Sequence, residues 1–99
     1  MMHRNTRKGL TEEIGTCERY VLGEKTTYRL LLDKMDEQIG YRIEIARGKD
    51  SAQSLLGEDF LSVAVLFAEI VRGEVFPYSL EEIAEDFRKN AKIYRDKNA

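Results

Sequence analysis

The sequence is poor in the residues that usually build catalytic and metal sites. It has one cysteine, one proline and one histidine in 99 residues, and tryptophan is absent. A single cysteine cannot form an internal disulfide, which favours a reducing cytoplasm as the setting of the protein. Cys17 and His3 are too few to hold a structural zinc ion, which takes three or four such ligands. We therefore expect no metal ion and no cofactor.

Charge and hydropathy argue against other classes. The formal net charge is −2, which argues against nucleic-acid binding by the domain as a whole. The longest apolar segment, residues 57–73, is interrupted by Glu69 and Arg72, so it falls short of the ~20 apolar residues that span a bilayer. The glycines are single and widely spaced, which excludes a glycine-rich phosphate loop. We expect neither a membrane segment nor a nucleotide site.

Carboxylates are the one abundant group with catalytic potential. Asp33, Asp36 and Glu37 cluster between two expected strands, and their spacing is that of a solvated turn rather than of a calcium loop. Glu85 and Asp86 are adjacent on an expected helix, so they point about 100° apart and cannot share one proton site. We expect no enzymatic activity. A carboxylate-based enzyme is kept as an alternative, and it needs acids with perturbed pKa values that converge in a cleft.

Alternating apolar and polar residues in the first half of the chain predict β-strands. Tyr41, Ile43 and Ile45 give the clearest alternation. Short connections between the alternating segments indicate antiparallel neighbours. The segment 49–56 fits either a loop or a short fourth strand, and we favour the strand. The expected strands are therefore residues 16–22, 26–35, 40–47 and 49–56.

The second half of the chain predicts two helices. In residues 57–73, Phe60, Phe67 and Val71 recur at helical spacing, and Leu61 and Ala68 widen this apolar sector. We therefore expect a helix that is buried on two sides, between the sheet and a second helix. Gly73 stands where a helix-ending residue in the left-handed conformation is expected. Ser79 and Glu82 are spaced as a capping box, and Tyr78 and Ile83 as a hydrophobic staple, at the start of the second helix, residues 79–94.

These elements predict an α+β fold in one domain. We expect an antiparallel three- or four-stranded meander sheet with two C-terminal helices packed on one face, in the order βββ(β)αα. Residues 1–13 carry basic side chains and few apolar ones, so we expect a flexible basic tail there. Residues 14–99 form the single α+β domain of this prediction.

Three segments resemble a known group of proteins. They are the strand Gly-Tyr-Arg-Ile-Glu-Ile, the link Val-Phe-Pro-Tyr-Ser-Leu and the helix Glu-Glu-Ile-Ala-Glu-Asp-Phe. Together with their order, they resemble a family of small proteins of unknown function found mostly in Gram-positive anaerobic bacteria. The resemblance covers residues 28–87. Because that family has no assigned activity, it implies a fold and a bacterial cytoplasmic setting, and no functional residues.

A surface for another protein is the leading functional hypothesis. Leu31 lies on the otherwise polar face of the expected sheet, and Val65 and Leu66 interrupt the polar stripe of the first helix that includes Glu69 and Arg72. These five residues form the candidate interaction surface. The alternative is ordinary surface apolarity, or cover from a terminal segment. The hypothesis describes a non-catalytic protein-interaction or regulatory module, with a homodimer as one form of it.

The N-terminal segment supports a second hypothesis. Arg4, Arg7 and Lys8 form a candidate basic arm that an anionic partner would attract. On this hypothesis the protein is an adaptor for nucleic acid or another anionic partner. A frayed tail explains the same residues.

Overall fold

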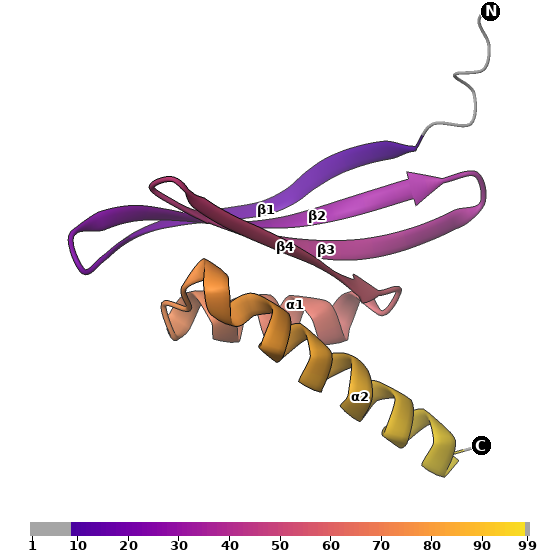
Figure 1. The fold of residues 1–99 in the computed structure, drawn as a ribbon. Coiled ribbons are helices and arrows are strands. Elements are labelled where there is room, and N and C mark those ends of the chain that lie inside the picture. The colour runs from indigo at the N-terminus through magenta and orange to yellow at the C-terminus, as the bar shows by residue number, and fades with distance from the viewer. Residues whose placement is uncertain (1–8, 99) are drawn as a thin grey trace, which may run out of the picture.

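Four antiparallel strands form one sheet, and two helices follow it. The computed structural model describes the backbone of residues 9–98 and the side chains of residues 9–90. The strands are β1 (Leu10–Val21), β2 (Glu24–Met35), β3 (Gln38–Arg47) and β4 (Asp50–Gly57), in the sheet order β1-β2-β3-β4 (Figure 1). The predicted α+β meander is confirmed, and so is the fourth strand.

The first strand begins earlier than the sequence predicts. Residues 10–13, expected in the basic tail, belong to β1, where Leu10 pairs with Lys34 and Thr11 with Asp33. The Thr11 hydroxyl donates a hydrogen bond to the Asp33 carboxylate at 2.8 Å. A bulge between Glu13 and Gly15 then shifts the register of β1 against β2 by one residue. The prediction of a tail over residues 10–13 was therefore wrong, and residues 1–8 lie outside the described part.

Two-residue turns connect the strands. Leu22 and Gly23 join β1 to β2 with φ of 50° and 83°, a pair of left-handed conformations typical of the turns that match strand twist. Gly48 opens the turn from β3 to β4 with φ of 59°. The first turn lies one residue before the predicted position, so Leu22 takes a conformation that suits Asn or Gly.

One face of the sheet carries the core. The side chains of Tyr28, Ile43 and Ile45 are fully buried on this face. Val63 from the first helix and Leu80 from the second complete the same apolar cluster. Each such side chain contributes about 1.5–3 kcal/mol when it is removed from water, so this cluster is the main source of stability.

The helices are α1 (Phe60–Arg72) and α2 (Leu80–Asn98), with the short 3-10 helix η2 (Pro77–Ser79) before α2. Both helices lie on the same face of the sheet, as predicted (Figure 1). Helix α1 packs on β2 and β3, whereas α2 packs along β4. The expectation that α1 is sandwiched between the sheet and α2 was therefore wrong, and α1 keeps an exposed side. Neither helix, within residues 9–98, is long and apolar enough to cross a membrane.

The helix ends differ from the predicted ones by about one residue. Gly73 has φ of −83°, and the left-handed residue is Glu74, with φ of 52°. The Glu74 amide donates to the Val71 carbonyl and the Val75 amide to the Ile70 carbonyl, which together form a Schellman motif. This pair of bonds places the left-handed position at Glu74.

The start of α2 departs from the predicted staple. Tyr78 is exposed and packs edge-on against Phe76, with ring centroids 5.5 Å apart, so it does not reach Ile83 as a staple. Ser79 ends η2, and its amide donates to the Phe76 carbonyl. Pro77 is buried at the first position of η2, where its missing amide donor is tolerated.

Candidate interaction surface

The exposed side of α1 is apolar. Leu61 and Val65 lie one turn apart and are 72% and 59% exposed, and Ala68 continues the same side. We call Leu61, Val65 and Ala68 the α1 stripe. The opposite side of the helix carries the buried residues Val63 and Ile70. Because α2 packs along β4, it leaves the stripe open.

The five residues of the predicted surface do not come together. Val65, Glu69 and Arg72 are exposed on α1, whereas Leu66 is half-buried and packs against the core. Leu31 lies on the other face of the sheet and is only 9% exposed. Leu31 and Leu66 are thus covered by the chain itself. Val65 belongs to the stripe, and Glu69 and Arg72 are exposed on the same helix.

Sequence reasoning missed Leu61 and Ala68, because it assigned them to a wide buried sector. Their spacing of four and three residues from Val65 was the available signal. Phe60 was also expected in the core, but it is 44% exposed at the start of α1, where its ring lies 5.5 Å from the Tyr41 ring. The expectation for Phe60 was wrong, because this end of α1 reaches the margin of the sheet.

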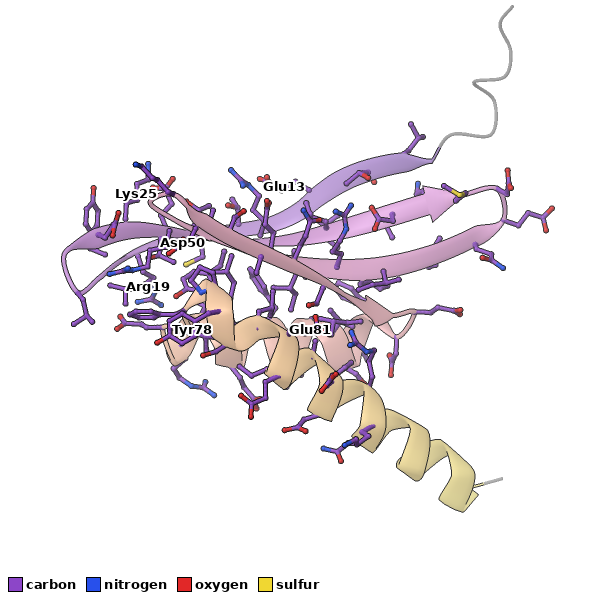
Figure 2. The ribbon with its side chains drawn as sticks, in the orientation of Figure 1. Glu13, Arg19, Lys25, Asp50, Tyr78 and Glu81 are labelled. Carbon is purple, nitrogen blue, oxygen red and sulfur yellow. The ribbon has the colours of Figure 1, made fainter. Side chains whose placement is uncertain are left out.

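Strand β1 forms an edge of the sheet beside α1. Across the described chain, β1 pairs with β2 alone. Phe67 of α1 reaches beneath this strand, since a Cβ placed on Gly15 would lie 3.8 Å from the Phe67 ring. Figure 2 shows Arg19 of β1 on the side of the sheet that carries the helices, and Glu13 on the other side. Helix α1 therefore lies beside the β1 edge through its sheet-facing residue Phe67, whereas the α1 stripe is on the opposite side of the helix.

The other face of the sheet is a network of paired charges. Arg42 donates to both oxygens of Asp33, at 2.9 and 2.6 Å, and also to the Gln53 amide oxygen. The hydrogen bonds from Arg42 hold the pKa of the Asp33 carboxyl below its ordinary value, and the same pair raises the pKa of Arg42. Arg29 lies between Glu13 and Glu44, at 3.1 Å from each. The charges on this face are satisfied within the chain.

A second polar cluster joins α2 to β4. The buried Ser54 hydroxyl donates to Glu81 at 2.7 Å, and Arg88 donates to both Glu81 and the Leu55 carbonyl. The Ser54 bond and then the Arg88 bond lower the pKa of the Glu81 carboxyl. This cluster fixes α2 against β4, and it explains why α2 does not cover α1.

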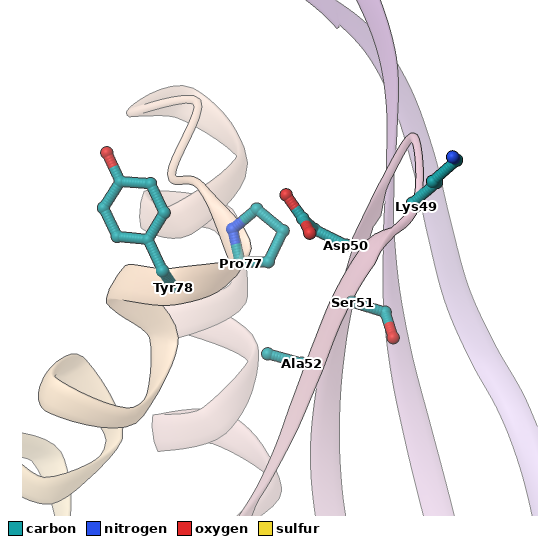
Figure 3. A pocket seen from close by; sticks show the side chains of 6 residues that line it. All are labelled: Lys49, Asp50, Ser51, Ala52, Pro77 and Tyr78. Carbon is teal, nitrogen blue, oxygen red and sulfur yellow. The ribbon is translucent and has the colours of Figure 1, made fainter.

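The hollows of the surface bring few reactive groups together. A cleft of about 400 Å³ lies between the start of β4 and η2. Figure 3 shows Asp50 facing Pro77 across it, while Lys49 and Ser51 point away. A more open hollow of about 890 Å³ is lined by the turn residues Met35 to Gln38. Among the side chains of residues 9–90, no three or more His, Cys, Asp or Glu are grouped as metal ligands.

The remaining sequence candidates are placed as follows. Cys17 is a free, half-buried thiol on the helix-facing side of β1. Arg4, Arg7 and Lys8, together with His3, lie outside the part of the chain that the structure describes. The adaptor hypothesis therefore stays a prediction.

Comparisons of the chain with protein-family models, with curated proteins and with solved structures each gave no match. The resemblance to a family of small bacterial proteins also stays a prediction.

Proposed function

We propose that this chain is a small non-catalytic interaction module that associates with a second copy of itself through the exposed side of α1. The observation that carries the proposal is the α1 stripe, in which Leu61 and Val65 stay in water although the opposite side of the helix is packed against the sheet. Burial of such side chains by another chain gains roughly 25 cal/mol for each Å² removed from water. When the partner is a second copy of this chain, one contact removes both stripes from water.

The charges beside the stripe favour a second copy. Glu69 and Arg72 are exposed on α1 and have opposite signs. In a twofold contact the same surface of each copy contacts the other in the opposite direction. The acidic group of one copy then faces the basic group of the other. A strongly charged partner would instead require one dominant sign on this side of the helix.

We also propose a cytoplasmic setting for this module. The single cysteine supports it, because a chain in an oxidising compartment usually carries cysteines in pairs.

The test is sedimentation equilibrium over a concentration series, with Val65→Glu as the disrupting variant. We expect the wild type to approach twice the monomer mass and Val65→Glu to dimerise at least about tenfold more weakly, since a buried unpaired charge costs more than 1.4 kcal/mol. Leu55→Glu is the matched control, because Leu55 is an aliphatic residue with 55% exposure on the opposite sheet face. Circular dichroism checks that each variant folds. A wild type that stays monomeric throughout, or equal effects of the two variants, would contradict the proposal.

A further inference from the structure

We propose that two copies join edge to edge, with their β1 strands antiparallel about a twofold axis at Thr16, so that two four-stranded sheets become one eight-stranded sheet. This inference rests on the self-association proposed above and specifies how the second copy is held. The carrying observation is that the ladder positions of β1 allow it to pair with itself from Leu10 to Val21, with opposite charges facing each other on the helix-facing side.

The peptide groups of β1 alternate between β2 and the free edge. Val21 and Glu24 flank a two-residue turn, so they form the first hydrogen-bonded pair of the hairpin. The peptide groups of Thr16, Glu18 and Tyr20 therefore point away from β2, toward the free edge. An edge with free donors and acceptors is a template for another strand unless charge, proline, a bulge or a covering element blocks it. The bulge of β1 is confined to Ile14, and residues 15–21 form a regular edge.

The bulge sets the register of this pairing. Against β2, Glu13 pairs with Leu31 and Thr16 with Arg29, so Ile14 is the extra residue between them. Glu13 and Glu18 are then both two ladder positions from Thr16. A twofold axis at Thr16 consequently places Glu13 opposite Glu18 of the second copy, with side chains on the same face.

The same register pairs opposite charges on the helix-facing side. Glu12 and Arg19 both lie on that side, because their β2 partners are Leu32 and Thr26, and both are exposed. The axis at Thr16 places Glu12 opposite Arg19 of the second copy, and the pair occurs twice. Leu10, which is exposed, falls opposite Val21 of the second copy, whose side chain is already buried in its own chain. Cross-strand pairs of opposite charge and of apolar residues are the contacts that stabilise a sheet.

The like charges on the outer face are already compensated. Glu13 is bound by Arg29 at 3.1 Å and Glu18 by Lys25 at 3.4 Å. Glu13 of one copy and Glu18 of the second copy are therefore each neutralised by a cation of their own chain when they face each other. On the helix-facing side, Phe67 places α1 directly beside β1, so the two α1 helices flank the seam.

A charge swap tests the register in solution. Glu12→Arg or Arg19→Glu alone creates two like-charge pairs, and we expect each to weaken dimerisation about tenfold in sedimentation equilibrium. The double variant restores the opposite signs, and we expect its dimer to approach wild-type strength. Both positions are exposed in the monomer, so each variant keeps the fold. Single variants without effect, or a double variant weaker than both singles, would overturn the inference.

Disulfide trapping tests the same register directly. In a Cys17→Ser background, Glu12→Cys with Arg19→Cys places two cysteines at a non-hydrogen-bonded pair, about 4.5 Å apart between Cα atoms, within disulfide range. The two cysteines of one chain are too far apart along β1 to bridge. We expect a covalent dimer on mild oxidation. Thr11→Cys with Arg19→Cys is the control, because its cysteines lie on opposite faces.

The outcomes separate the two proposals. A wild type that never dimerises removes both. The dimer could be weakened by Val65→Glu but unaffected by the charge-swap variants at Glu12 and Arg19, and give no disulfide between cysteines at these two positions. That result would keep the proposed function and overturn the edge pairing. Trapping by the control pair also overturns the register.

Discussion

The buried hydroxyl of Tyr28 gives the sharpest prediction for stability. Tyr28 is fully buried on β2, and its hydroxyl donates to the Val75 carbonyl at 3.0 Å, across 47 residues of sequence. That carbonyl directly follows the Schellman motif at the end of α1. The bond therefore holds the end of α1 to the sheet, and Tyr28→Phe removes it while keeping the ring.

The size of the effect follows from the burial of both partners. A neutral hydrogen bond contributes about 0.5–1.5 kcal/mol, and a carbonyl left without a partner adds to the loss. Val75 is half-buried, so water replaces part of the bond. We expect Tyr28→Phe to lower the free energy of unfolding by about 1.5 kcal/mol. For a domain of this length that corresponds to a fall of about 6–12 °C in Tm.

The dependence on pH provides a second readout of the same group. Burial, and then the charge of Glu74, raise the pKa of the Tyr28 phenol above its ordinary value. A group with a raised folded-state pKa contributes stability that is complete below the unfolded pKa, about 10, and is lost as the pH rises through the folded pKa. The difference between wild type and Tyr28→Phe should therefore shrink above about pH 10.

Urea denaturation followed by circular dichroism measures both effects. Tyr78→Phe is the matched control, because Tyr78 is exposed and its hydroxyl lies on the surface. We expect no change for the control. If Tyr28→Phe and Tyr78→Phe unfold at the same urea concentration at pH 7, the bond to Val75 does not stabilise the fold.

Three further substitutions test other features, each by thermal or urea unfolding. Glu74→Gly should raise the free energy of unfolding by about 0.5–1 kcal/mol, because Glu74 has φ of 52° and glycine adopts it freely; no gain would contradict the Schellman geometry. Leu22→Asn should stabilise by a similar amount of about 0.5–1 kcal/mol, because Leu22 is 84% exposed with φ of 50°; a loss would mean that Leu22 has a packing role. Asp33→Asn should destabilise at neutral pH, because the hydrogen bonds from Arg42 lower the pKa of Asp33. This stability is complete above the unfolded pKa, about 4, and the difference should vanish as the pH falls through the lower folded pKa. A difference that persists in acid would point to a loss unrelated to charge.

Sequence patterns were sufficient to predict the sheet, because the alternation of apolar and polar residues shows which side chains share a face of a strand. Tyr41, Ile43 and Ile45 alternate with polar residues, and they are the buried side of β3. The start of β1 carries no such signal, because Thr11, Glu12 and Glu13 are exposed at an edge where neither face is covered. Alternation also does not show how deeply a side chain is buried. Leu31 was assigned to the correct face, but it is buried there between its cross-strand neighbours.

The exposed side of α1 could not be predicted from its own residues. The apolar sector of α1 is wide enough for cover on two sides, so Leu61 was expected to be buried. Which side is covered depends on where α2 lies, and the bonds that place α2 on β4 join Ser54, Glu81 and Arg88 from distant segments. A helix wheel contains no information on such a contact.

Hydrogen exchange of the β1 amides, measured by NMR at low and high protein concentration, tests the central claim most directly. The amides of Thr16 and Glu18 face the free edge, so in the monomer they exchange with water. We predict that their exchange slows as the concentration rises through the dimerisation range, while the amides of Cys17 and Arg19, which bond to β2, stay protected throughout. Equal exchange rates for Thr16 and Glu18 at low and high concentration would contradict the account.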